Sequence, residues 1–114
     1  MILVNSASDA KLNYHTGIVQ SKDSFYGQHD PDSIPVSYEL NQKWEAWVKG
    51  GVLCSEMEVS TLFVVGAYRK VRTGALLVVY GDQNRKEALN KEAYHDSVNM
   101  ATNVILESSL TIDQ

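Results

Sequence analysis

Apolar positions recur at helical spacing in several stretches of the chain. The first stretch begins near Ser37, which can cap a helix. It ends at Gly50-Gly51, since glycine accepts the left-handed conformation common at helix C-termini. A second helix is predicted over residues 58–70, and a third from Asp96 or Ser97 through Leu110. The inward positions of the three helices are Leu40, Trp44, Trp47 and Val48, then Val59, Leu62, Phe63 and Gly66, then Val98, Ala101, Val104 and Ile105.

Three other segments have the composition of β-strands. Residues 14–20 are rich in β-branched and aromatic side chains, and residues 52–55 form a short apolar run. Residues 75–80 are continuously apolar, which is typical of a strand buried on both faces. Residues 23–36 contain Gly27 and both prolines and are predicted to be a loop with turns. Residues 1–12 are compatible with a short strand or with a helix.

The alternation of predicted strands and helices favours the α/β class with a parallel or mixed sheet. We expect one domain over residues 1–114, since this length suits a single hydrophobic core. Three or four strands make a thin sheet, whereas the apolar segment 75–80 requires cover on both faces. The pattern therefore predicts part of a larger three-layer α/β/α sandwich with a mixed central sheet.

Composition and charge exclude several classes of protein. The net charge of -4 and the pI near 5.2 disfavour a binder of nucleic-acid polymers. The uncharged runs are too short to cross a membrane, which takes about 20 residues. Cys54 is the sole cysteine, so no internal disulfide can form, and no signal peptide is visible; both features favour the cytoplasm. The three histidines have no metal-ligand spacing, and no metal is expected.

The sharpest local feature is Glu56-Met57-Glu58, where the strand at 52–55 passes into the second helix. Ligands of α/β proteins bind beyond the carboxyl ends of strands. Two carboxylates there can accept charge-assisted hydrogen bonds from a vicinal diol such as that of ribose, with Met57 under the sugar ring. The alternative is that acidic residues at a helix start simply offset the helix dipole.

Two loops carry further candidates. Phe25 and Tyr26 adjoin a glycine turn and are followed by Gln28, an arrangement that can stack a flat ring and hydrogen-bond its edge. The alternative is a turn anchored by aromatic rings. Asp82 and Arg85 follow the apolar run 75–80 and can serve as an acid or as a charge clamp on a leaving group. A polar loop that merely closes a strand is the alternative there.

At these residues the sequence resembles the nucleoside phosphorylase family, which contains uridine phosphorylase and the hexameric purine nucleoside phosphorylases. The segments 23–32, 35–40 and 43–47 look most like uridine phosphorylases, and residues 55–62 match the family's sugar-binding Glu-Met-Glu motif. The resemblance runs from about Tyr14 to Leu110.

The resemblance implies a role for each matching residue. Glu58 would accept hydrogen bonds from both ribose hydroxyls, Glu56 would assist, and Met57 would pack against the sugar. Phe25 would line or stack on the base, and Gln28 would read its edge. An arginine helps to hold the pyrimidine in many uridine phosphorylases, and Asp30 stands at that position here. In the later loop, Asp82 would match the proton donor of purine phosphorylases, or residues 83–85 would mimic the uridine phosphorylase loop.

The family's phosphate-binding glycine and arginines lie in an N-terminal half that nothing in this sequence matches. The chain therefore looks like the C-terminal portion of a phosphorylase. The resemblance implies phosphorolysis of uridine or a related nucleoside in nucleoside salvage, with phosphate as co-substrate and no other cofactor. Intact relatives form homo-oligomers. We expect the 114-residue chain alone to be inactive.

Three alternatives remain beside uridine phosphorolysis. The first is a purine nucleoside phosphorylase. The second is a non-catalytic module that keeps the nucleoside half-site without turnover. The third is hydrolysis, as in related nucleosidases that share the Glu-Met-Glu motif, although the loop at Phe25 to Gln28 favours phosphorolysis.

Overall fold

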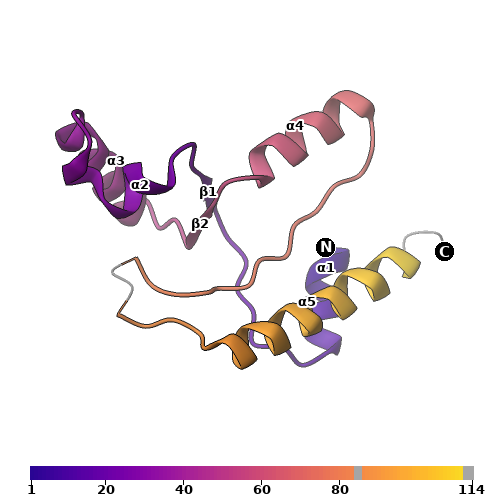
Figure 1. The fold of residues 1–114 in the computed structure, drawn as a ribbon. Coiled ribbons are helices and arrows are strands. Elements are labelled where there is room, and N and C mark those ends of the chain that lie inside the picture. The colour runs from indigo at the N-terminus through magenta and orange to yellow at the C-terminus, as the bar shows by residue number, and fades with distance from the viewer. Residues whose placement is uncertain (84–85, 112–114) are drawn as a thin grey trace. The chain divides into compact units, whose positions relative to one another are not determined.

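The computed structural model describes residues 1–83 and 86–111 (Figure 1). The described residues form helices and a small parallel sheet, as expected for an α/β protein. They divide into two compact units, one of residues 17–73 and one of residues 1–16 with the described residues from 74 onward.

A pair of short parallel strands organises the unit of residues 17–73. β1 (Val19–Ser21) pairs with β2 (Cys54–Glu56), with Gln20 opposite Ser55 and Ser21 opposite Glu56. One more backbone hydrogen bond extends the pairing at each end, from Leu53 N to Ile18 O (2.9 Å) and from Lys22 N to Glu56 O (2.8 Å). Both strands run in the same direction, so their carboxyl ends lie at one edge of the sheet.

Three helical segments connect the two strands. They are α2 (Phe25–His29), the 3-10 helix η1 (Pro31–Ser33) and α3 (Ser37–Lys49). Residues 23–36 were predicted to be a loop, and this was wrong for α2, because the Ser24 hydroxyl accepts from Gly27 N (3.0 Å) and starts a helix there. The helix at α3 is confirmed, but no side chain caps it and Ser37 is its first residue. Gly51 follows it with φ of 77°, as expected of glycine at a helix end.

α4 (Val59–Arg69) follows β2 directly and confirms the second predicted helix. Figure 1 shows the strand pair between α2 and α3 on one side and α4 on the other. Gly66 is buried where Thr73 returns along α4, and a Cβ there would lie 2.3 Å from Thr73 Cγ2. Most apolar side chains of α4 remain exposed, with Val64 at 69% and Tyr68 at 85%.

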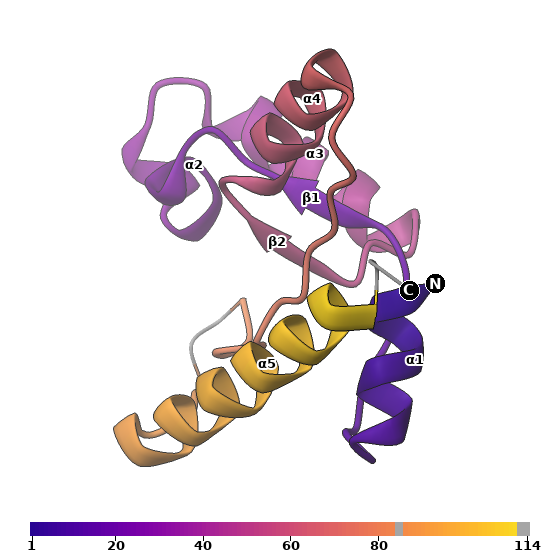
Figure 2. The same ribbon diagram turned by 90° about the vertical axis from the view of Figure 1, so that its right-hand side faces the viewer.

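The second unit is built on two helices. α1 (Ile2–Asp9) packs on α5 (Lys91–Thr111), and both views show them side by side (Figures 1 and 2). Ala7 and Val104 are buried. α5 begins earlier than the predicted Asp96 or Ser97, because the Asn90 side chain accepts from Ala93 N (2.9 Å). The N-terminal segment is thus a helix, one of the two forms its pattern allowed.

The predicted strand at residues 75–80 was wrong, since the structure assigns no strand there. Val79 is 65% exposed, and in this segment the backbone bond to another part of the chain is at its last residue, where Tyr80 O accepts from Leu89 N (2.8 Å). After it, an isolated antiparallel bridge joins Gly81 to Ala88. An apolar run becomes a strand only where another strand satisfies its backbone groups.

The described residues therefore contain a two-stranded parallel sheet in place of the mixed central sheet that the sequence predicted. Two strands with helices on either side do not make a complete three-layer sandwich. Among the described helices, none has the length and apolarity needed to span a membrane.

Candidate functional site

The carboxyl ends of β1 and β2 bring together most of the residues singled out from the sequence. Ser21, at the end of β1, donates a hydrogen bond from its hydroxyl to Glu56 Oε1 at the end of β2. The same hydroxyl oxygen accepts from Ser60 N (3.0 Å) in the first turn of α4. The strand pair and α4 are therefore joined at the Glu-Met-Glu motif.

Glu56 starts α4. Its Oε2 accepts from the backbone N–H of Glu58 (2.5 Å) and of Val59 (2.6 Å). These bonds satisfy donors that have no partner inside a helix. Glu56 thus acts as the alternative interpretation predicted, as an acidic residue that supports the start of a helix. Its carboxylate also fixes the backbone of the Glu-Met-Glu motif.

The hydrogen bonds of Glu56 set its protonation. Burial raises the pKa of its carboxyl group, but the Ser21 hydroxyl, the two backbone N–H groups and the nearby Lys22 ammonium lower it more. The net pKa lies below the ordinary glutamate value, so the ionised form is favoured in the folded chain.

This shift predicts a pH dependence of stability. A folded pKa below the unfolded one gives stabilisation that is full above the unfolded pKa and is lost as pH falls through the folded pKa. The free energy of unfolding is therefore expected to decrease below the ordinary glutamate pKa, and Glu56→Gln should weaken that decrease. Urea unfolding at neutral and acidic pH measures both. Glu45→Gln, which removes an exposed partner of Lys49, is the control. An unchanged pH profile in Glu56→Gln would contradict the assignment.

Glu58 and Met57 are more open than Glu56. Both are exposed, and Met57 N donates to Glu58 Oε2 (3.2 Å). Glu58 therefore has a carboxylate that solvent and a ligand can reach, beside a flexible thioether side chain.

The candidate base-binding residues lie on α2. Phe25 and His29 are one turn apart, with ring centroids 4.4 Å from each other. Phe25 is 40% exposed, so a ligand can reach part of this residue. Gly27 lies between these two residues in the sequence and is buried. A Cβ at this position would lie 3.0 Å from Ser24 Oγ. A compact turn at residue 27 thus holds the aromatic pair.

Ser55 joins α2 to the strand ends. Its Oγ accepts from Gln28 Nε2 (2.8 Å) and from Lys22 Nζ (3.0 Å). Ser55 immediately precedes Glu56 on β2. These bonds place the amide of Gln28 next to the Glu-Met-Glu motif.

Lys22 is the cation of this group. Its ammonium lies 5.9 Å from the centroid of the Phe25 ring. Burial lowers its pKa, while Glu56, Glu58 and Cys54 act in the opposite direction, and the net pKa lies below the ordinary lysine value. Lys22 therefore supplies positive charge beside Phe25 and Gln28.

The remaining predicted site residues lie elsewhere in the chain. Asp82 belongs to the other unit, where its Oδ1 accepts from Glu87 N (3.2 Å) and helps to close the loop after Tyr80. Arg85 lies outside the described residues. The roles of both in a reaction stay predictions.

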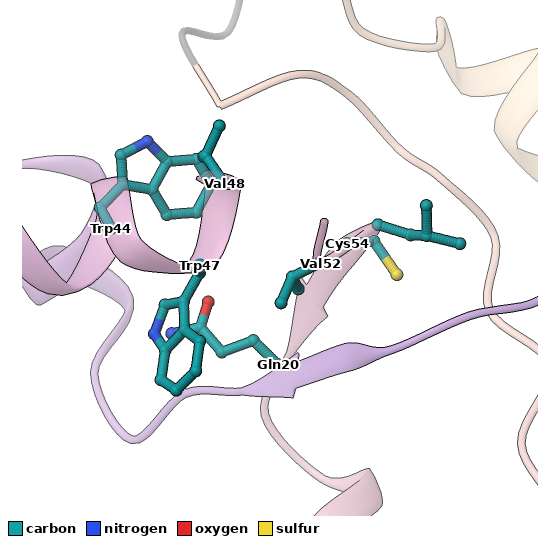
Figure 3. Close-up of a pocket in the computed structure, with 7 residues that line it drawn as sticks. Gln20, Trp44, Trp47, Val48, Val52 and Cys54 are labelled. Atoms are coloured by element: carbon teal, nitrogen blue, oxygen red, sulfur yellow. The ribbon is translucent and has the colours of Figure 1, made fainter. Parts of the chain in front are cut away.

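A small cavity lies between the strands and α3 (Figure 3). Its volume is about 40 Å³, far below the roughly 300–1,000 Å³ of ligand pockets. Its walls are Gln20, Trp44, Trp47, Val48, Val52, Leu53 and Cys54. It contains none of the candidate site residues, and a nucleoside does not fit in it.

Sequence reasoning missed Ser21, Lys22 and Ser55. All three lie at or just beyond the carboxyl ends of the two strands, which is the signal that could have found them. The predicted strand 14–20 ends one residue before Ser21, and Ser55 was assigned to a strand without a role of its own.

Comparison with known proteins agrees with the resemblance. The family model described as Phosphorylase superfamily matches residues 2–110. Uridine phosphorylase of Treponema pallidum is 44% identical over 113 residues, which are 98% of this chain and 44% of the relative. Uridine phosphorylase of Escherichia coli is 29% identical over 110 residues, which are 94% of this chain and 44% of the relative.

A purine enzyme matches a shorter part. Purine nucleoside phosphorylase of Plasmodium vivax is 36% identical over 75 residues, which are 66% of this chain and 27% of the relative. The chain thus spans less than half the length of these relatives. With a family model that covers nearly all of its residues, the chain belongs to the phosphorylase superfamily.

Proposed function

We propose that this chain forms the nucleoside-binding part of a uridine phosphorylase, which converts uridine and phosphate to uracil and ribose 1-phosphate. The proposal is supported by the identity to uridine phosphorylases over almost the whole chain. It is carried by one observation, the Ser55 hydroxyl that joins Gln28 and Lys22 beside the Glu-Met-Glu motif. Groups suited to a base and groups suited to a sugar thereby adjoin each other.

Glu58 is the proposed ligand of the ribose. Its exposed carboxylate accepts hydrogen bonds from the 2′- and 3′-hydroxyls, and Met57 contacts the ring. Both carboxylate oxygens of Glu56 already accept hydrogen bonds, one from Ser21 and one from the backbone at the start of α4. Glu56 therefore positions Glu58 and does not itself bind the sugar. Holding the sugar in one orientation favours attack of phosphate at C1′.

Phe25, Gln28 and Lys22 are the proposed ligands of the base. The exposed part of Phe25 packs on the pyrimidine. Gln28 and Lys22 donate hydrogen bonds to carbonyl oxygens of uracil. As the glycosidic bond breaks, negative charge develops on these oxygens, and a nearby ammonium stabilises it electrostatically. Asp82 and Arg85 are proposed to act on the leaving base as an acid or as a charge clamp.

The rest of the proposal follows from the family. The complete fold is a three-layer α/β/α sandwich, and the phosphate site lies in the part of the relatives that this chain does not match. Phosphate is the co-substrate and no other cofactor takes part. We further propose a homo-oligomer that acts in the cytoplasm in nucleoside salvage.

A chimera tests the proposed activity. The 114-residue chain replaces the matched segment of the Treponema pallidum relative, to which it is 44% identical. The chimera is expected to release uracil from uridine when phosphate is present, and to act less well on inosine. Hydrolysis in the absence of phosphate would favour a nucleosidase, and better turnover of inosine would favour a purine enzyme.

The isolated chain serves as the complementary experiment. It is expected to bind uridine without releasing uracil, because the proposed phosphate site is not part of it. Calorimetric titration with uridine measures binding, and chromatography of the products measures turnover. A folded chimera without activity, made from a chain that still binds uridine, would support a non-catalytic nucleoside-binding module.

A further inference from the structure

We infer that Ser55 is a positioning residue that determines which edge of a nucleobase the site accepts. The inference rests on the proposed function and deepens it. Its basis is the convergence of two donor side chains on one oxygen: Ser55 Oγ accepts from Gln28 Nε2 at 2.8 Å and from Lys22 Nζ at 3.0 Å.

The chemistry of a hydroxyl explains the result of this convergence. A serine oxygen has two acceptor sites and one proton to donate. Gln28 and Lys22 occupy both acceptor sites, so the Ser55 proton is directed away from them. Each of the two donors also keeps further N–H groups, one on the amide nitrogen and two on the ammonium. The cluster of Ser55, Gln28 and Lys22 therefore presents donors.

The orientation of the Gln28 amide also indicates that the cluster presents donors. Its Oε1 has almost no exposed surface, whereas its Nε2 is the atom held by Ser55. The amide thus turns its NH₂ group toward the cluster. Removing the Ser55 oxygen removes the hydrogen bond that holds Nε2 on this side.

A group of donors with one positive charge recognises carbonyl oxygens. Uracil has two of them, and its anion carries negative charge on them after the glycosidic bond breaks. A base that offers an amino group at this edge leaves the donors without acceptors, which is unfavourable. Ser55 therefore selects a carbonyl-bearing base by fixing Gln28 and Lys22, without being the residue that carries the charge.

Ser55→Ala and Ser55→Thr separate this role from a structural one, since threonine keeps the hydroxyl at the same strand position. Calorimetry on the 114-residue chain measures the affinities for uridine, cytidine and methyl β-D-ribofuranoside, which carries the sugar alone. Ser55→Ala is expected to weaken uridine about tenfold, to lose most of the preference for uridine over cytidine, and to leave the methyl riboside unchanged. Ser55→Thr is expected to behave as the unmodified chain.

Three results would overturn the inference. In the first, Ser55→Ala keeps the preference for uridine over cytidine, which removes the role of Ser55 and leaves the proposed function intact. In the second, uridine and the methyl riboside weaken by the same factor, which makes Ser55 a support of the strand. In the third, the unmodified chain binds neither compound, which removes the proposed function as well.

Discussion

Replacing Glu58 with alanine is expected to weaken uridine binding about 100-fold, because two charge-assisted hydrogen bonds to the ribose disappear together. Each such bond contributes roughly 1.5–3 kcal/mol, so the loss of two bonds is enough for a 100-fold decrease in affinity. The variant should also lose its affinity for methyl β-D-ribofuranoside. Calorimetric titration of both compounds measures the effect.

Two further variants sharpen the Glu58 experiment. Glu58→Gln keeps the size of the side chain and one acceptor but removes the charge, and a loss of about tenfold is expected. Glu45→Ala removes an exposed glutamate that pairs with Lys49 on the surface, and uridine binding should be unchanged. Equal affinities in Glu58→Ala and Glu45→Ala would exclude Glu58 from the sugar site.

Replacing Lys22 with methionine is expected to weaken uridine binding about 30-fold while the methyl riboside binds as before. Methionine keeps most of the length and apolar contact of lysine, including the approach to the Phe25 ring, and removes the ammonium. The same substitution should raise the pKa of Glu56, since Lys22 is one of the groups that lower it. Calorimetry and carboxyl-group NMR titration measure the two effects.

Lys49→Met is the matched control for Lys22. Lys49 is an exposed lysine of the same unit, and it forms an ion pair with Glu45 on the surface of α3. Its substitution should change neither uridine affinity nor the titration of Glu56. Should Lys22→Met and Lys49→Met bind uridine equally well, the positive charge of the base site must come from another residue.

Local sequence pattern predicted those elements that depend mainly on local interactions. α3 and α4 form where the apolar spacing predicted helices, and both begin and end within two residues of the prediction. The predicted inward positions were wrong in part, since exposed residues include Trp47, Val48, Leu62 and Phe63. α2 escaped prediction, since its start depends on a hydrogen bond from Gly27 N to the Ser24 hydroxyl that composition does not reveal. The segment 75–80 has the composition of a buried strand, but a strand needs a neighbour along its length, and among the described residues Leu89 bonds only the last residue, Tyr80.

The candidate site was predictable to a similar degree. The Glu-Met-Glu motif and its position after a strand were visible, and β2 ends at Glu56. The sequence did not reveal that Glu56, and not Glu58, supports the helix start. This difference depends on which carboxylate reaches the N–H groups of residues 58 and 59. Lys22 and Ser55 come together only through the parallel register of β1 and β2, which brings residues more than 30 positions apart into contact.

The bond from Ser21 to Glu56 has a consequence for hydrogen exchange. The carboxylate that accepts from the amides of Glu58 and Val59 also accepts from a hydroxyl of the neighbouring strand, so fraying at the start of α4 breaks a contact with β1 as well. These two amides are therefore expected to exchange with deuterium more slowly than those of a helix start without such a bond. Opening of this turn should be coupled to loss of the Ser21 contact, and the Glu58 carboxylate should lose its orientation in the same event.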